Sequence, residues 1–322
     1  MNMVANGVTV MQAVKGSRLS GKALPAQRSW RKRGGASAAA AAMVLLAACS
    51  SSTSKSPAKA ADTATARFAD QLPDNIRSAG VLRDVSPFTY PPYDYASPSG
   101  DLVGGEIDIL NAVGPLLGVK MKYERISGFA AMIPAIVSGR FDMAGESIGI
   151  TPPRRKQVAF VQYGAIGEGL LVRTGNPTGL KVTDLCGHSV AVEAGTSEVS
   201  VYPDISQKCV AAGKKKVTVN VYANNPAQVL AVVSGHDDAA GVGSTAVPAI
   251  AKASNDKLVD AGGLVPGYDL PIGFVVAKDN LALGKALESA LSYLLQNGEL
   301  AKINAKYNLA ASLSVQFLPA TS

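Results

Sequence analysis

The stretch Gly139-Arg140-Phe141-Asp142-Met143-Ala144-Gly145-Glu146-Ser147-Ile148-Gly149-Ile150-Thr151-Pro152-Pro153-Arg154 indicates a strand, a loop and a helix start in quick succession. The mostly apolar residues 141–145 predict an inner strand of an α/β layer, entered from a helix through the turn Ser138-Gly139. Gly145 and Gly149 let the backbone approach whatever lies beyond the carboxyl end of that strand, which is where open α/β sheets bind ligands. A ligand site is therefore expected here.

The end of the same stretch predicts a helix that begins beside a positive charge. Thr151 is a good N-cap residue and Pro152 suits the first helical position, so Arg154 is expected in the first turn. A helix N-terminus offers free N–H groups, and a guanidinium pairs with carboxylates through two bonds. We therefore expect Arg154 to be an anion receptor, although a solvated charge run at 154–156 is the alternative.

An internal echo predicts two similar lobes. Residues 136–145 are echoed by residues 232–241, and both segments contain the tripeptide Val-Ser-Gly. The turn glycines Gly139 and Gly235 lie 96 positions apart. Each unit would end a strand in a loop facing a shared cleft, unless the likeness is a chance similarity between two ordinary helix-to-strand turns.

The first 48 residues form a typical export leader. They contain no Asp or Glu and seven basic residues, followed by an apolar run at 36–48 that is too short to span a membrane. The motif Leu46-Ala47-Ala48-Cys49 resembles a bacterial lipobox, in which the cysteine is lipidated and becomes the new N-terminus. An ordinary secretory signal with an incidental cysteine is the alternative. The Ser-, Thr-, Ala- and Lys-rich residues that follow, to about 69, predict a flexible tether.

The charge balance argues against nucleic-acid binding. Removing the seven leader charges from 31 Lys and Arg leaves 24, against 24 Asp and Glu, so the remainder is formally neutral. Nucleic-acid binders depend on excess positive charge. No later stretch of the sequence is long and apolar enough to cross a bilayer, so a lipid anchor is the expected membrane contact.

The cysteines and histidines predict a disulfide and no metal or other cofactor. If Cys49 carries lipid, Cys186 and Cys209 remain to pair in an oxidising compartment, where the bridge would contribute about 3 kcal/mol. Two buried free thiols are the alternative. His188 and His236 lie far apart in the sequence with no ligand cluster around them.

Strands and helices are predicted in alternation from about residue 70 to 310. Thr174-Gly175-Asn176-Pro177 predicts the crossover between lobes. Strands are expected at 81–85, 119–123, 141–145, 158–160, 169–172, 189–192, 217–221 and 272–277, and helices at 107–117, from 129, at 227–233, from Asp279 or Asn280, and from 300.

Several short motifs together resemble the solute-binding proteins of ABC importers, family 3, which mostly carry polar amino acids. The motifs are Tyr90-Pro91-Pro92-Tyr93, Gly105-Glu106-Ile107-Asp108-Ile109, Gly139-Arg140-Phe141-Asp142, Ile150-Thr151-Pro152-Pro153-Arg154, Gly195-Thr196 and Gln296-Asn297-Gly298-Glu299-Leu300-Ala301-Lys302-Ile303. The resemblance implies an α/β fold of two lobes, the type II periplasmic-binding-protein-like fold, with a mixed sheet flanked by helices in each lobe and a two-strand hinge. The expected order is signal peptide 1–48, tether 49–69, lobe 1 at 70–173, lobe 2 at 174–270 and a return to lobe 1 at 271–312.

The resemblance also implies which residues hold the ligand. Tyr90 and Phe129 match the aromatic residues that sandwich its aliphatic part, and Arg154 matches the arginine that grips its carboxylate. Backbone and hydroxyl donors are expected from Ser147 and Gly149 in one lobe and from Thr196 and Ser197 in the other. Phe129 as a plain core residue, and Thr196 or Ser197 as a simple helix cap, are the alternatives.

Three positions depart from the family pattern and shift the expected ligand chemistry. Gly149 stands where the family usually has Ser or Thr, Gly243 where it has an Asp for the α-ammonium, and Pro87 where binders of cationic side chains have Asp. A buried ammonium left without a carboxylate costs several kcal/mol. We therefore expect Glu146 to supply the negative charge, unless it points to solvent at the cleft edge.

The implied function is a capture protein, not an enzyme, for an ABC importer. It would be an exported lipoprotein on the outer face of the cytoplasmic membrane or in the periplasm, would act as a monomer, and would pass a small zwitterionic solute to a membrane permease. The alternatives are a periplasmic dehydratase of cyclohexadienyl substrates, with Glu146 as general acid, and a ligand-sensing module.

Overall fold

The computed structural model of the chain describes residues 66–311 and 314–321. The predicted leader, the lipidation site Cys49 and the predicted tether up to residue 65 lie outside the described residues. Residues 66–68, at the end of the predicted tether, lie against the folded part, because Ala66 N donates to Pro115 O at 2.7 Å and Phe68 N donates to Leu116 O at 2.9 Å.

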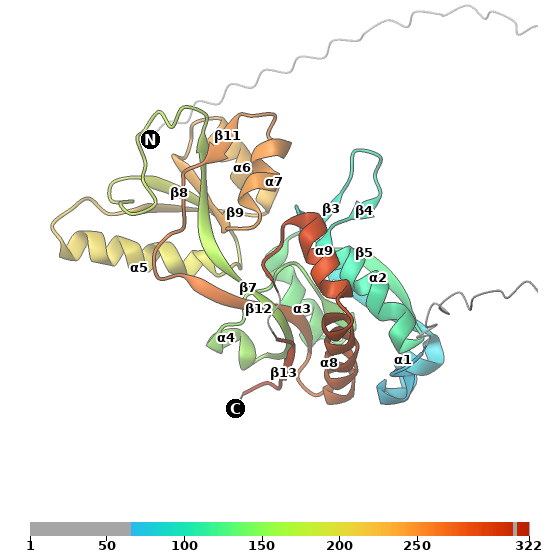
Figure 1. Cartoon of the computed structure of the whole chain (residues 1–322). Coiled ribbons are helices and arrows are strands. Elements are labelled where there is room, and N and C mark those ends of the chain that lie inside the picture. Colours follow the sequence, from blue (N-terminus) through green and yellow to red (C-terminus); the bar gives the residue numbers. More distant parts are fainter. Residues whose placement is uncertain (1–65, 312–313, 322) are drawn as a thin grey trace, which may run out of the picture. The chain divides into compact units, whose positions relative to one another are not determined.

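The described chain contains both strands and helices along its whole length (Figure 1). The strands are β1 (Val81–Ser86), β2 (Thr89–Tyr90), β3 (Asp94–Ala96), β4 (Leu102–Val103), β5 (Lys120–Arg125), β6 (Met143–Ala144), β7 (Val158–Arg173), β8 (Ser189–Glu193), β9 (Thr218–Tyr222), β10 (Ala239–Gly243), β11 (Leu258–Asp260), β12 (Asp269–Ala277) and β13 (Gln316–Leu318). The helices are α1 (Asp74–Ala79), α2 (Gly105–Leu117), α3 (Met132–Val137), α4 (Pro152–Arg155), α5 (Glu198–Ala211), α6 (Asn225–Val233), α7 (Val247–Ala253), α8 (Leu281–Gln296) and α9 (Glu299–Tyr307), with 3₁₀ turns at Ala69–Gln71 and Phe129–Ala131.

Two long strands connect the two lobes of the mixed α/β fold. The main sheet has the order β5-β1-β6-β12-β7-β10-β8-β9, with β11 and β13 also paired to β7. The first half of β7 pairs with β12 and β13, and its second half pairs with β10 and β11. Figure 1 shows β7 and β12 side by side where the two lobes meet. In the strand order β5, β1 and β6 lie on the lobe 1 side of this pair, and β10, β8 and β9 lie on the lobe 2 side. These two strands form the two-strand hinge.

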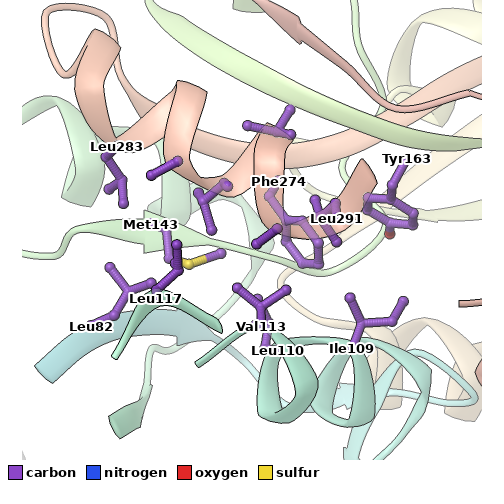
Figure 2. Packing of buried hydrophobic residues seen from close by; sticks show 14 of the residues in the cluster. Leu82, Ile109, Leu110, Val113, Leu117, Met143, Tyr163, Phe274, Leu283 and Leu291 are labelled. Carbon is purple, nitrogen blue, oxygen red and sulfur yellow. The ribbon is translucent and has the colours of Figure 1, made fainter. Parts of the chain in front are cut away.

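Lobe 1 packs its helices against the sheet through a dense apolar core (Figure 2). The predicted stripe of α8 is buried, with Leu283, Leu287 and Leu291 fully covered. Asn280, one of the two predicted caps, accepts a hydrogen bond from Leu283 N at 3.2 Å and so begins this helix. Each such buried side chain stabilises the lobe by about 1.5–3 kcal/mol.

The internal echo corresponds to two equivalent corners of the fold, one in each lobe. Helix α3 turns into β6 and helix α6 turns into β10, through Gly139 with φ +71° and Gly235 with φ +79°. In the first corner Asp142 Oδ2 accepts from Arg83 N at 2.8 Å, and in the second Asp238 Oδ2 accepts from the backbone of β8 at 2.9 Å. The prediction of a repeated helix–turn–strand unit is confirmed.

Three local predictions differ from the structure. The separate strands expected at 158–160 and 169–172 are one strand, β7, because pairing with β12 continues past Gly164 with a register shift at 272/273. The chain therefore passes between the lobes inside β7, and the segment at 174–177 is a turn that follows it, closed by Asn176 N donating to Arg173 O at 2.8 Å. The strand expected at 141–145 is shorter, at Met143–Ala144.

Two further links stabilise the lobes. The predicted disulfide between Cys186 and Cys209 is present and joins the segment before β8 to the end of α5, with the Cα atoms 5.6 Å apart. The carboxyl-terminal strand β13, which the sequence did not predict, pairs with β7 and buries Phe317 against α8. Within the described part of the chain, none of the helices combines the length and apolar character that a membrane span requires.

Candidate functional site

A cavity of about 250 Å³ lies between the two lobes. Six carboxylate residues line it, and among the described residues that line it there is no Lys, Arg or His. Its wall is completed by aromatic, hydroxyl, amide and small apolar residues. The lining residues are Tyr90, Phe129, Glu146, Ser147, Gly149, Thr151, Ile166, Gly167, Glu168, Glu193, Thr196, Ser197, Glu198, Ser200, Val201, Asp204, Asn225, Gln228, Gly241, Val242, Gly267, Tyr268, Asp269 and Leu270.

Glu146 lies in the loop between β6 and α4 and brings an unpaired carboxyl group to the cavity. Its exposed fraction is 3%, and neither carboxyl oxygen has a hydrogen-bond partner. Burial, and then the charges of Glu193 and Glu106, raise the pKa of this carboxyl well above its usual value. The alternative that Glu146 points to solvent is therefore wrong.

The loop that carries Glu146 is held in shape by Glu106 on the first turn of α2. Ser147 adopts a left-handed backbone conformation with φ +52°, and its N–H donates to Glu106 Oε1 at 2.8 Å. The hydroxyl of Tyr163, on the hinge strand β7, donates to the same oxygen. Left-handed backbone is uncommon for residues other than glycine, so this carboxyl group fixes a strained loop against the hinge.

Arg154 lies in the first turn of α4, as predicted, and Thr151 Oγ1 accepts a hydrogen bond from its N–H at 3.4 Å. The guanidinium donates to Gly149 O and to Gly195 O, each at 2.7 Å, and so joins the two lobes. It also lies over the ring of Phe129, with Cζ 5.2 Å from the ring centre. Its exposed fraction is 8%, and burial lowers its pKa.

Arg154 is therefore not part of a solvated charge run. It does not itself line the cavity, but Gly149 and Phe129, which it contacts, do. A guanidinium has five N–H donors, so two bonds to carbonyl oxygens leave three donors for other partners. The arrangement can bind an anion while keeping its bond across the lobes.

The two predicted aromatic residues line the cavity and contact the opposite lobe. Tyr90 Oη accepts a hydrogen bond from Gly243 N at 2.8 Å, and its ring stacks on that of Tyr93 with centres 5.9 Å apart. Phe129 N donates to Glu193 Oε1 at 3.3 Å. Both residues are partly buried. Both rings therefore lie at the same cavity between the lobes.

Side chains of neighbouring residues lie close to Gly149 and Gly243. A side chain at Gly149 would overlap Leu270 of β12 and come within 3.2 Å of Arg154 Nη1. At Gly243, which does not line the cavity, a Cβ would come within 2.6 Å of Ile166 Cδ1 and 3.1 Å of Tyr90 Oη. Neighbouring side chains thus occupy the space in which a hydroxyl or carboxylate would sit.

The predicted donors Thr196 and Ser197 line the cavity, but their hydroxyl groups bond within their own loop. Thr196 Oγ1 donates to Glu193 O at 2.8 Å, and Ser197 Oγ donates to Glu198 Oε2 at 3.1 Å. Ser197 precedes helix α5 without making a side-chain cap bond, so the simple helix-cap alternative is not supported.

The sequence reasoning missed the carboxylates of lobe 2, above all Glu168 and Glu193. Glu168 is buried on β7, and Tyr202 Oη donates to it. Burial raises the pKa of Glu168 well above its usual value and raises that of Glu193 to about 7. The signal was present in Gly167-Glu168-Gly169, because a charged residue inside an apolar strand pattern is seldom buried without a function.

Comparisons with known proteins agree with this geometry. Residues 85–310 match the sequence profile described as bacterial extracellular solute-binding proteins, family 3. The chain is 22% identical over 243 residues to the arginine-binding protein ArgT of Corynebacterium glutamicum, covering 75% of this chain and 79% of that protein. It is 26% identical over 253 residues to the L-cystine-binding protein TcyJ of Escherichia coli, covering 78% and 91%.

Solved structures of amino acid-binding proteins are also similar to this chain. An ancestral arginine-binding protein bound to arginine matches with a TM-score of 0.63 and 29% identity, over 71% of this chain and 98% of that one. An ancestral amino acid-binding protein, described as a precursor of cyclohexadienyl dehydratase, matches with a TM-score of 0.64 and 27% identity, over 73% and 98%. The chain belongs to the bacterial extracellular solute-binding proteins of family 3.

Proposed function

We propose that this protein captures a small amino acid of net positive charge in the cavity between its lobes and delivers it to an ABC permease. The observation that carries the proposal is the acidic lining of the cavity, because six carboxylate residues and no cationic residue are found among its described lining residues. Unpaired carboxylates in a buried site favour a cationic guest. Relatives named as arginine-binding proteins support the same class of solute.

Within this proposal each predicted residue has a role. Arg154 binds the carboxylate of the solute with its remaining N–H donors, while the rings of Tyr90 and Phe129 cover its aliphatic part. Glu146 binds an ammonium or guanidinium group and replaces the carboxylate that is missing at Gly243. Ser147, Gly149, Thr196 and Ser197 complete the surroundings of the solute.

Contacts across the cleft support a mechanism in which binding favours the closed arrangement. Arg154 bonds to Gly195 O, and Tyr93 Oη hydrogen-bonds to Thr245 Oγ1, each joining one lobe to the other. A solute that touches both lobes stabilises the state in which these bonds form. A permease would then recognise the loaded, closed protein.

The cellular setting follows from the sequence and the family. The family consists of extracellular proteins, which supports export of this protein. We propose that residues 1–48 are removed and that Cys49 carries the lipid anchor. We further propose a tether from residue 49, two lobes that meet at the hinge, and a monomer as the active form. A Cys49→Ala variant is expected to leave the membrane fraction.

We propose that the protein acts by binding and not by catalysis, because the named relatives are binding proteins. The structural neighbour that preceded cyclohexadienyl dehydratase is itself described as an amino acid-binding protein. Turnover of prephenate by the purified protein would contradict this part of the proposal.

A thermal-shift panel tests the proposed function. Arginine, lysine, ornithine, cystine, glutamine and glutamate are added to the purified protein. At a hundredfold excess over Kd a ligand stabilises the fold by about 2.7 kcal/mol, which corresponds to roughly 5–10 °C in Tm for a domain of this size. We expect the cationic members to give this shift and glutamate to give none.

Two variants and a control connect the shift to the site. Glu146→Gln removes the negative charge, and Arg154→Lys removes the planar fork, so both should reduce the shift given by arginine. Asp279→Asn, which changes an exposed carboxylate before α8, should keep it. A larger shift with glutamate than with arginine, or an undiminished arginine shift in Glu146→Gln, would contradict the proposal.

A further inference from the structure

Four carboxyl groups lie buried together in lobe 1, and one of them reaches the cavity. The carboxyl cluster consists of Asp84 on β1, Asp94 on β3, Glu106 on α2 and Glu146 on the loop after β6. The exposed fraction is 3% for Glu146 and 1% for each of the other three. Glu106 acts electrostatically on the other three, and Asp84 and Glu146 act on Asp94. Glu146 lines the cavity.

The surroundings do not neutralise the carboxyl cluster. Glu106 Oε1 accepts two hydrogen bonds, but Glu106 Oε2, both oxygens of Glu146, and Oδ1 of Asp84 and of Asp94 have no partner. Among the ion pairs of the described residues, none includes a member of the cluster. The described residues also offer no group of His, Cys, Asp or Glu arranged to hold a metal ion.

Every charged group that acts on Glu146 is another carboxylate. Asp84, Asp94 and Glu106 act from within lobe 1, and Glu193 on β8 acts from lobe 2. The backbone N–H of Thr89 favours the charged form of Glu146, but it is not placed to donate a hydrogen bond to either carboxyl oxygen. Buried like charges cannot all ionise, so at least one member of such a cluster holds a proton at neutral pH.

The directions of the pKa shifts agree with this geometry. Burial raises the pKa of Asp84 and of Asp94 well above the usual value and raises that of Glu106 to about 7. The tyrosine next to the cluster, Tyr163, is fully buried and donates to Glu106, so it adds no positive charge.

We propose that Glu146 carries a proton when the cavity is empty and releases it when a cationic solute binds, so that capture and proton release are one event. In this step the O–H bond of Glu146 breaks, the proton passes to water, and the carboxylate that remains pairs with the cation of the solute. The inference rests on the proposed function, because it requires a cationic solute. Apparent affinity then rises by up to tenfold per pH unit while Glu146 is protonated in the empty protein.

The first test reads the proton without any ligand. Infrared difference spectra compare the empty wild-type protein with the Glu146→Gln variant at about neutral pH, with Asp279→Asn as the matched control. We expect a carbonyl band of a protonated carboxylic acid that is present in the wild type and in the control and is lost in Glu146→Gln. Equal bands in the wild type and in Glu146→Gln would overturn the proposal.

The second test counts the protons that leave on binding. L-arginine is titrated calorimetrically in phosphate and in Tris, whose ionisation heats differ, so the buffer dependence of the heat gives the number of protons released. We expect about one proton per arginine for the wild type and for Asp279→Asn, and about none for Glu146→Gln. Binding whose heat is independent of the buffer overturns the inference and leaves the proposed function intact. Absence of arginine binding contradicts the proposed function and the coupling together, while the infrared band still reports whether Glu146 is protonated.

Discussion

Replacing Glu106 by Gln changes how the stability of the fold depends on pH, because this buried carboxyl takes up a proton at a higher pH in the folded protein than in the unfolded chain. Gln keeps an acceptor oxygen for Tyr163 and for Ser147 N–H, so the loop that carries Glu146 retains its support. The Gln side chain therefore resembles the protonated acid and leaves no void at position 106.

The magnitude follows from the pKa shift. Burial raises the pKa of Glu106 from 4.5 to about 7. Between these values the folded state binds more protons than the unfolded state, so the free energy of unfolding falls as pH rises through this window. A shift of about 2.5 units at about 1.4 kcal/mol per unit corresponds to a loss on the order of 3 kcal/mol, complete above about pH 7.

The assay is urea unfolding at several pH values between about 4.5 and 8. Across this pH range the free energy of unfolding of the wild type is expected to fall by on the order of 3 kcal/mol more than that of Glu106→Gln, with unchanged m-values. Asp279→Asn, an exposed carboxylate, serves as the control and should follow the wild type. Parallel stability curves for the wild type and Glu106→Gln would refute the reasoning.

Three further predictions follow from the packing. Gly149→Ser should weaken arginine binding in calorimetry, because the new serine side chain overlaps Leu270. Adding Leu270→Ala should restore part of the affinity. Equal affinities of the single and the double variant would show that this overlap does not affect binding. Cys186→Ser should lower the free energy of unfolding in urea by about 3 kcal/mol, and an unchanged value would show that the bridge contributes nothing. Deleting residues 314–322 removes β13 and the hydrogen bond that Arg155 of α4 donates to Pro319 O at 2.9 Å, so Tm and arginine affinity should both fall. If neither falls, the carboxyl-terminal segment does not hold α4 in place.

The repeated corner and the helix start at Arg154 could be predicted because their signals are local. A turn glycine with positive φ, a capping threonine and a proline at the first helical position each act within a few residues. The disulfide could be predicted because few cysteines were available. For the corner and the helix start, neighbouring residues in the sequence decide the structure.

The acidic character of the cavity was harder to predict because it depends on which strands meet. Glu168 on β7 and Glu193 on β8 line the same cavity as Glu146 only because the two lobes pack on each other. Leu270, which fills the space beside Gly149, is 121 positions away in the sequence and reaches it through β12. The continuity of β7 across its glycines likewise follows from pairing with β12, which no single stretch of sequence reveals.

A crystal structure of the protein with L-arginine tests the central claim most directly. The claim predicts the ligand in the cavity between the lobes, with its carboxylate on the guanidinium of Arg154, a cationic group on Glu146, and the rings of Tyr90 and Phe129 on either side. A ligand whose carboxylate lies away from Arg154, or one bound outside this cavity, would contradict it.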